Sequence, residues 1–321
     1  MATQYAKNQP PGFINAIKNV ALVGATGQIG KVFTEYLLKS GKQTVTALTR
    51  KGSKTTVPEG IKLAHIDYND QVSLIEVLKG QDLLVITLAL TAPPDTHSKL
   101  VRAAGKAGVS YIVPNAYGVD FYGHPKFQDD IKALKYIHAS VKEVEDYEYS
   151  LGVRPFTYGF DFPNKKVTFY DEGKTQVNTT TWPQTGRTLA ALVNIKKLPQ
   201  DENDKSTTLA HFANKPVYIK SFTLKQRELL DSINKVLGQT DEDWTISYQP
   251  AVERFREGLD ELSKGVGTGF LKALYSRAFY PTSDGVFQTH NDLLGLPEES
   301  LDEATLASRN WAIAQAEKNE E

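Results

Sequence analysis

Near the start of the chain, an apolar strand leads into three evenly spaced glycines and an amphipathic segment, and this feature restricts the possible folds most. The strand is Val20–Val23, and the glycines are Gly24, Gly27 and Gly30. Glycine allows a tight chain reversal and close packing of a helix on a strand, and it leaves backbone N–H groups accessible. The spacing, a variant of GxGxxG, predicts a turn that places a diphosphate on the N-terminus of the next helix.

Short apolar runs alternate with segments of helical periodicity through the rest of the first half. The expected strands are Asn19–Val23, Thr44–Thr49, Ile61–Ile66, Leu83–Leu88 and Tyr111–Val113. The expected helices are Ile29–Leu38, Val72–Leu78 and Thr96–Ala107, with a longer helical stretch at Phe127–Leu151. Strands that are mostly apolar, with helices between them, indicate an α/β fold: a Rossmann-type, doubly wound parallel sheet covered on both faces.

Beyond Phe162 this alternation is lost, which predicts a second, smaller α/β unit. A strand is expected at Phe156–Tyr158, and we place the domain boundary near Phe160. Residues 1–160 would then form the dinucleotide-binding domain, and residues 161–321 a substrate-binding domain. In the second unit the sequence indicates a strand at Pro216–Ile219, a helix at Leu224–Leu237, a glycine-rich aromatic stretch at Gly265–Phe287 and a frayed tail at Glu317–Glu321.

Composition excludes several functions. A formal net charge of −1 over 321 residues disfavours nucleic acid as a partner. The chain has no cysteine, so thiolate catalysis and disulfides are ruled out, and its six histidines lack ligand spacing, so we predict no metal. No apolar run reaches the length of about eighteen residues that a membrane span needs. We expect a cytoplasmic protein that acts on a small molecule; the oligomeric state is left open.

A basic segment at the end of the second expected strand indicates which dinucleotide binds. Arg50 stands 20 residues after Gly30, where NAD enzymes often carry Asp or Glu. A guanidinium there suits the 2′-phosphate of NADPH, and Lys54 or Ser53 could add a contact. The predicted cofactor is therefore NADPH. Its predicted site comprises Gly24, Thr26, Gly27, Gln28, Ile29, Gly30, Arg50 and Lys54.

Four segments in this order resemble the NmrA-like and isoflavone-reductase-like group of atypical short-chain dehydrogenases. They are Val23–Gly30, the Arg50 loop, Tyr111–Asp120, and Lys142–Tyr147 with its continuation to Val153. The second half resembles the group more loosely, through Val167–Gly173 and Asn214–Gly238. The resemblance implies an NADPH-dependent reductase of aromatic or other secondary metabolites, with a small C-terminal substrate domain. Its NmrA branch implies instead a dinucleotide-sensing regulator without catalysis.

The chain departs from this group at the catalytic positions. After Pro114 the reductases usually have Ser-Glu-Phe-Gly, whereas this chain has Asn115–Gly118. The common Tyr-x-x-x-Lys pair is also missing, because Phe121 and Leu151 stand four residues after the two candidate tyrosines, Tyr117 and Tyr147. Catalysis by that pair is not expected.

On the resemblance, Lys142 is the first candidate for proton donor or electrostatic anchor. In the ungapped register, however, the lysine of the group falls on Val141. Tyr117 is the second candidate, because it follows the fifth strand at the sheet edge where α/β proteins bind ligands.

Each of these residues has a structural alternative. Lys142 could be a solvated helix lysine, Tyr117 a packed tyrosine with a bonded hydroxyl, and Arg50 part of a solvated basic loop. Asp67 and Asp70 could approach the adenine or cap the following helix. Aromatic residues that could line a substrate pocket, or simply pack in the core, are Phe156, Tyr158, Phe160, Phe162, Phe270, Tyr275, Phe279 and Tyr280.

Overall fold

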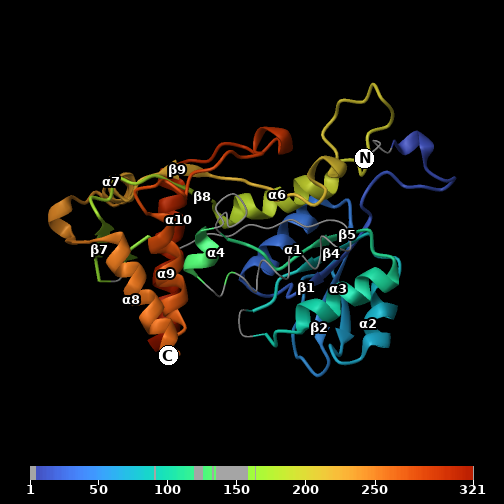
Figure 1. Ribbon diagram of the computed structural model, residues 1–321, viewed down its shortest axis with the longest axis horizontal. Coiled ribbons are helices and arrows are strands. Elements are labelled where there is room, and N and C mark those ends of the chain that lie inside the picture. Colours follow the sequence, from blue (N-terminus) through green and yellow to red (C-terminus); the bar gives the residue numbers. More distant parts are fainter. Residues whose placement is uncertain are drawn as a thin grey trace.

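The computed structural model describes residues 5–89, 92–118, 126–131, 134, 158–162 and 164–320, with side chains as far as residue 311. A five-stranded sheet and its helices lie at one end of the molecule (Figure 1). A group of helices and shorter strands lies at the other end, and helix α6 (Trp182–Asn194) runs between the two.

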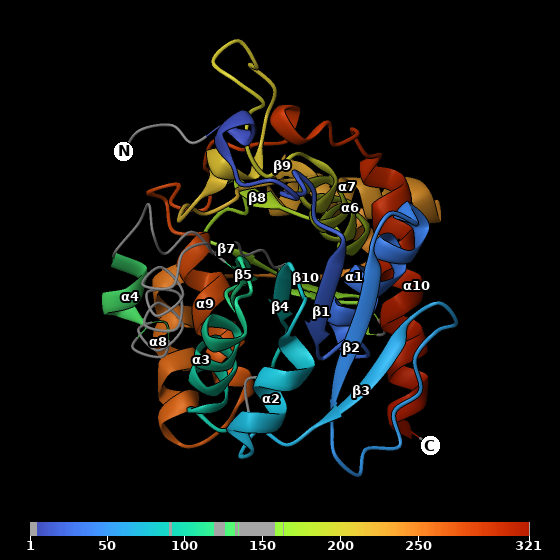
Figure 2. The ribbon, with the colours of Figure 1, turned by 90° about the vertical axis from the view of Figure 1, so that its right-hand side faces the viewer.

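The first sheet is parallel throughout, with strand order β3-β2-β1-β4-β5 (Figure 2). Its strands are β1 (Asn19–Val23), β2 (Thr44–Arg50), β3 (Lys62–Ile66), β4 (Leu83–Ile86) and β5 (Tyr111–Val113). The order reverses between β1 and β4, which is the point where ligands of such sheets bind. The predicted Rossmann-type sheet is confirmed. Strand β4 ends before the predicted Leu88, because the backbone of Leu88 pairs with the side chain of Asn115 instead of a strand.

Helices cover both faces of this sheet because alternate residues of each strand point to opposite sides. Val20 and Leu22 pack with α1 and α6 on one face. Ala21 and Val23 pack with α2 and α3 on the other. The helices are α1 (Gln28–Ser40), α2 (Gln71–Leu78) and α3 (Thr96–Ala107). Since α6 lies beyond Phe160, a segment from the second half of the sequence covers the first sheet; the boundary itself stays a prediction.

The second part contains two small sheets with orders β10-β7-β6 and β8-β9. Its strands are β6 (Phe160–Asp161), β7 (Lys166–Tyr170), β8 (Val177–Thr179), β9 (Phe222–Leu224) and β10 (Thr245–Gln249). The remaining α-helices are α4 (Lys126–Asp130), α7 (Gln226–Leu237), α8 (Ala251–Ser263), α9 (Thr268–Ala278) and α10 (Leu301–Glu320). Short 3₁₀-helices lie at Ala6–Asn8, Leu209–Phe212, Asp241–Asp243 and Asp292–Leu294.

The predicted strand at Pro216–Ile219 was wrong. Val217 and Ile219 are buried, as the pattern suggested, but Pro216 has no N–H group to pair in a ladder. The backbone N–H of Tyr218 instead donates to Nδ1 of His290. The backbone of Lys220 is likewise bound on both sides by the Asn291 amide.

One other segment differs from expectation. Residues 317–320, expected to be a frayed tail, continue helix α10. The aromatic stretch at Gly265–Phe287, for which no element was predicted, contains helix α9. Of the long helical stretch predicted at Phe127–Leu151, the first turns fall in and just after α4, and most of the remainder lies outside the described residues.

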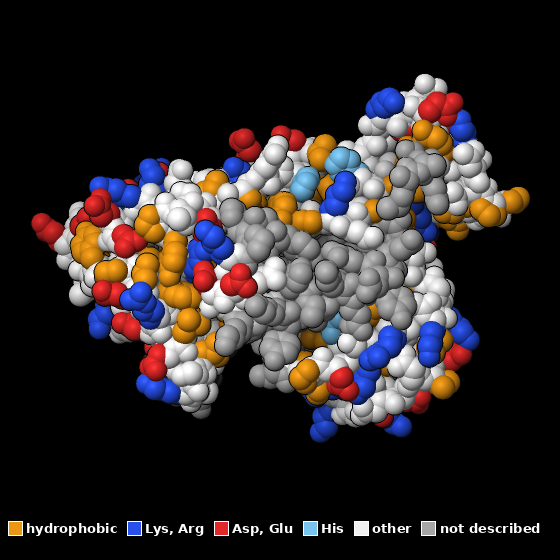
Figure 3. All heavy atoms as spheres, in the orientation of Figure 1, with side chains coloured by type: hydrophobic (Ala, Val, Ile, Leu, Met, Phe, Trp, Pro, Cys, Tyr) orange, Lys and Arg blue, Asp and Glu red, His pale blue; other side chains and the backbone are white. Residues whose placement is uncertain are grey.

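Basic and acidic side chains are interspersed on the face of the molecule shown in Figure 3. Within the part of the chain that the structure describes, no helix is both long and apolar enough to cross a membrane.

Candidate functional site

The glycine turn between β1 and α1 is held by Thr87, the first residue after β4. The Thr87 hydroxyl donates to the carbonyl oxygens of Val23 (2.7 Å) and Gly24 (3.2 Å). Gly24 has φ +77°, and a Cβ atom there would lie 2.1 Å from the carbonyl oxygen of Thr87. Only glycine fits this position, because both the backbone angle and the close approach exclude a side chain.

Gly30 and Gly27 have different surroundings. A Cβ on Gly30 would lie 2.0 Å from the carbonyl oxygen of Gly24, so this glycine lets α1 pack against the turn. Gly27 is exposed, and its Cβ would have one neighbour within 4 Å, the Gly24 oxygen at 3.2 Å. Thr26 and Gln28 beside it are also exposed, whereas Ile29 is buried against the sheet.

This geometry leaves the N-terminus of α1 open at Gly27. Gly27 is the N-cap of the helix, and its own N–H donates to Gly24. The first N–H groups of a helix have no partner within the helix, and the helix dipole favours an anion there. The turn therefore has the open space and the N–H donors that a diphosphate needs.

A group of basic side chains lies at the carboxyl end of β2. Arg50 is the last residue of this strand and is exposed, as is Lys54 in the loop that follows. Neither side chain forms an ion pair or a hydrogen bond with another described residue. Burial raises the pKa of the neighbouring Tyr68, and the positive charge of Arg50 opposes that rise. Because β1 and β2 are parallel, these cations lie at the same sheet edge as the glycine turn.

The two aspartates at the end of β3 have structural roles. Asp70 accepts a hydrogen bond from the N–H of Ser73 (3.0 Å) and caps helix α2. Asp67 accepts from the N–H of Asn69 (2.8 Å) in the turn before it. The capping alternative predicted for this pair is thus confirmed for Asp70.

The tyrosine after β5 is bound to the sheet. The Tyr117 hydroxyl donates to the carbonyl oxygen of Ile86 (3.0 Å), and its ring lies 5.7 Å from that of Phe33 in α1. Next to it, the Asn115 amide forms a reciprocal pair with the backbone of Leu88, at 3.0 and 3.2 Å. Asn115 thereby fixes the loop after β4. Lys142, the other predicted catalytic residue, lies outside the described residues.

A pocket of about 940 Å³ opens in the second part of the molecule. Strands β6 to β9, the first turn of α6, the start of α8 and one side of α10 form its walls. The aromatic residues that line it are Tyr158, Phe160, Phe162, Trp182, Phe222 and Trp311. Burial raises the pKa of Tyr158 to about 12, so its hydroxyl stays protonated at neutral pH.

Three of the aromatic residues named from the sequence, Tyr158, Phe160 and Phe162, line this pocket. Phe279 is fully buried in the core, and the other three described ones pack against buried clusters. Phe156 lies outside the described residues. Trp182, Phe222 and Trp311 were not singled out, because no local pattern distinguishes them from packing residues.

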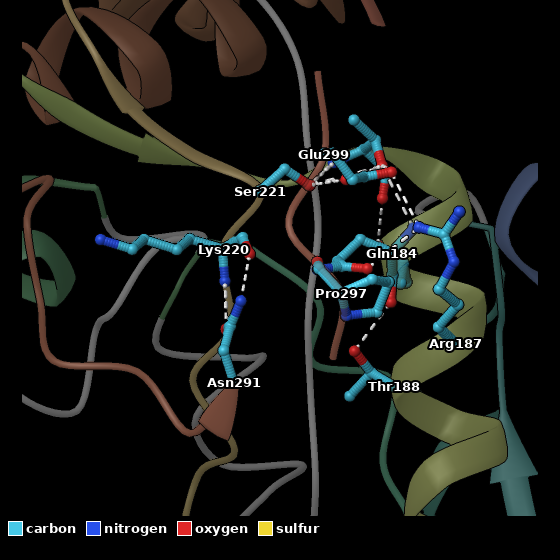
Figure 4. A network of polar contacts seen from close by, with 10 residues as sticks. Gln184, Arg187, Thr188, Lys220, Ser221, Asn291, Pro297 and Glu299 are labelled. Atoms are coloured by element: carbon cyan, nitrogen blue, oxygen red, sulfur yellow. Dashed lines mark hydrogen bonds and ion pairs between the residues drawn. The ribbon is translucent and has the colours of Figure 1, made fainter. Parts of the chain in front are cut away.

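A polar network at one end of the pocket fixes the start of α10 (Figure 4). The Glu299 carboxylate accepts hydrogen bonds from the hydroxyls of Thr181 and Ser221 and from Nη1 of Arg187, the last at 2.8 Å. Fully buried Gln184 donates to the carbonyl oxygen of Pro297 at 2.8 Å. The segment before α10 is thus held against α6.

Helix α6 connects the pocket to the helix of the glycine turn. Its first turn lines the pocket, and its next turn packs on α1. A Cβ on Gly186 would lie 2.4 Å from the Tyr36 ring and 2.8 Å from Val32, so the two helices approach closely there. The guanidinium of Arg187 lies 5.7 Å from the centre of the same Tyr36 ring. Among the described side chains, no group of three or more His, Asp or Glu residues is placed to hold a metal.

Comparison with known proteins agrees with this geometry. Residues 24–159 match a family model described as NAD(P)H-binding. The chain is 26% identical over 304 residues to oxidoreductase aprR of Aspergillus flavus, a match that covers 88% of this chain and 96% of the relative. It is 25% identical over 240 residues to phenylcoumaran benzylic ether reductase TP7 of Nicotiana tabacum, covering 69% and 75% of the two chains.

The crystal structure of isoflavone reductase has the same fold. The two superpose with a TM-score of 0.67 at 20% sequence identity, over 90% of this chain and 98% of the other. The resemblance predicted from the sequence motifs is confirmed. Residues 24–159 thus carry an NAD(P)H-binding domain, and over most of its length the chain is similar to oxidoreductases, isoflavone-reductase-like proteins among them.

Proposed function

We propose that this protein reduces a small aromatic substrate by hydride transfer from NADPH. The observation that carries the proposal is the shared sheet edge at which the open glycine turn lies beside the unpaired cations Arg50 and Lys54. NADPH differs from NADH by a 2′-phosphate, and an unpaired guanidinium is the side chain best suited to bind it.

The residues of the turn would hold the cofactor as follows. The diphosphate would rest on the N–H groups at Gln28 and Ile29, over the surface left open at Gly27. Thr26 lies exposed at the rim of this surface. Arg50 would bind the 2′-phosphate, with Lys54 as a second cation. Bound NADPH would supply the hydride.

The rest of the chain would supply orientation and a proton. The pocket lined by Tyr158, Phe160 and Trp182 has the volume and the aromatic walls suited to a substrate of one or two rings. Lys142 is the proposed proton donor. Under this assignment residues 1–160 bind the cofactor and residues 161–321 bind the substrate, although α6 also packs on the first sheet.

A second function, a dinucleotide sensor without catalysis, is favoured by one observation. The hydroxyl of Tyr117 already donates to the Ile86 carbonyl, so this residue positions backbone and is not ready to donate a proton to a substrate. If Lys142 does not reach the nicotinamide either, the site lacks both predicted donors.

One assay distinguishes the two functions. NADPH oxidation is followed at its absorbance maximum across phenolic enones, aldehydes and ketones, with and without a chelator. Reduction of at least one compound, unaffected by chelator, is expected from the reductase. Tight NADPH binding without turnover of any compound would favour the sensor, and activity that returns only with zinc would contradict the metal-free prediction. A cytoplasmic location also stays a prediction.

A further inference from the structure

We infer that Trp311 of helix α10 determines substrate specificity, by holding an aromatic ring of the substrate next to Trp182. The inference rests on the proposed function, because it takes the 940 Å³ pocket as the substrate site. Beyond the proposed function, the inference states that the wall formed by α10 selects the substrate.

Trp311 and Trp182 come from different helices and meet at the pocket. Their ring centres are 5.1 Å apart with an interplanar angle of 81°, an edge-to-face contact. Both residues line the pocket, and 41% of Trp311 stays exposed. Aromatic rings attract one another in this geometry, and the uncovered surface of Trp311 remains available to a third ring.

The position of Trp311 is not fixed by the protein core. Of the described α10 side chains, Leu301 to Trp311, none that is apolar is buried. Polar contacts hold the first turns: the Ser232 hydroxyl of α7 donates to Asp302 (2.8 Å) and to Thr305 (3.0 Å). Beyond Thr305, the described part of α10 is joined to α6 by the contact between the two tryptophans.

This anchoring makes the outer end of α10 an adjustable wall. The Glu299 network and the Ser232 contacts fix the start of the helix, whereas Trp311 meets α6 through the edge-to-face contact with Trp182. Phe160 and Phe162 also line the pocket, and their rings stack with centres 6.0 Å apart. A flat aromatic substrate therefore meets aromatic surface on β6 and on α10, and Trp311 is the part of this surface that the core does not hold.

The experiment uses 2-naphthol, a neutral two-ring aromatic alcohol, as a probe of the pocket. Its affinity is measured by fluorescence titration on the full chain and on Trp311→Ala, Trp311→Phe and Leu306→Ala. Leu306 is the matched control, because it lies on the same helix with the same 41% exposure and does not line the pocket. Circular dichroism and thermal unfolding verify that each variant is folded.

Trp311→Ala should weaken naphthol binding about tenfold or more, Trp311→Phe should restore most of the affinity, and Leu306→Ala should bind as the parent does. Equal binding by Trp311→Ala and the parent, or no binding by the parent, would overturn the inference. NADPH affinity, measured on the same samples, should be unchanged in all variants. A parent that fails to bind NADPH would defeat the proposed function without changing the naphthol result.

Discussion

The ammonium group of Lys197 donates a 2.7 Å hydrogen bond to the carboxylate of Asp82, which joins the segment after α6 to the loop before β4. The same carboxylate accepts from the backbone N–H groups of Lys18 and Asn19, at the start of β1. Lys197 is buried, and the side chain of Asp82 is mostly so. The contact therefore ties the amino ends of two central strands to the second half of the chain.

This ion pair predicts acid sensitivity. Burial alone would raise the pKa of Asp82, but the hydrogen bonds from Lys197 and from the two backbone N–H groups outweigh it and lower the pKa. A depressed folded-state pKa contributes stability that is complete above the unfolded value of about 3.9 and is lost as pH falls through the folded value. Asp82→Asn should cost about 2 kcal/mol in the free energy of unfolding near neutral pH.

Urea unfolding at about pH 7 and about pH 3 measures this effect. Because the variant has no carboxylate to titrate at position 82, the difference in free energy of unfolding between parent and variant should be smaller at the lower pH. Glu35→Gln, which removes an exposed i,i+4 pair with Lys39, serves as the control and should change little at either pH. A difference in free energy of unfolding that is the same at both pH values would show that the Asp82 carboxylate is not the titrating group.

Substitutions at two of the three glycines of the turn should have different effects. Gly27→Val should abolish dinucleotide binding in a folded protein, because its side chain would enter the open surface where the diphosphate is proposed to lie. Gly30→Ala should instead destabilise the fold by about 1–3 kcal/mol, because its Cβ meets the backbone of Gly24. Thermal unfolding with and without NADPH separates the two. NADPH-dependent stabilisation of a folded Gly27→Val variant would place the phosphate elsewhere.

The position of Arg50 predicts that the protein prefers NADPH to NADH. A charge-assisted hydrogen bond is worth about 1.5–3 kcal/mol, so Arg50→Ala should weaken NADPH binding roughly ten- to a hundredfold and leave NADH binding nearly unchanged. Lys42→Ala is the control, since Lys42 is an exposed cation just before the opposite end of the same strand. Titration of both cofactors on all three proteins is the measurement. Equal affinities of the parent for NADPH and NADH would contradict the assignment.

Those parts of the fold that local periodicity encodes were predictable. The strands of the first sheet have apolar runs, and the positive φ of Gly24 explains why that residue stands where the chain reverses. Contacts between distant segments were not predictable. The hydroxyl of Thr87 and the amide of Asn115 fix the site only because β1, β4 and β5 become neighbours. The pocket is even more difficult to predict from the sequence, because Trp182 and Trp311, which both line it, are separated by more than a hundred residues.

The last prediction decides between reductase and sensor, and it concerns Lys142, which lies outside the described residues. The segment Glu143–Tyr147 fits the reductases without a gap, yet in that register their lysine falls on Val141. One residue on an α-helix corresponds to about 100° of rotation, enough to turn a side chain from the cofactor towards solvent. A local irregularity of the helix, together with the long lysine side chain, would restore the direction.

We expect that the Lys142 side chain does point towards the cofactor. Lys142→Ala should then lower turnover by about 10²–10⁴ while NADPH affinity stays nearly intact. Val141→Lys in the Lys142→Ala background tests the register directly, because it should recover activity if position 141 faces the nicotinamide. Parental turnover by Lys142→Ala on a confirmed substrate would move the proton donor to another group, with Tyr117 the next to test. In that case the Tyr117 hydroxyl would have to leave the Ile86 carbonyl, so Tyr117→Phe should lower turnover as well as stability.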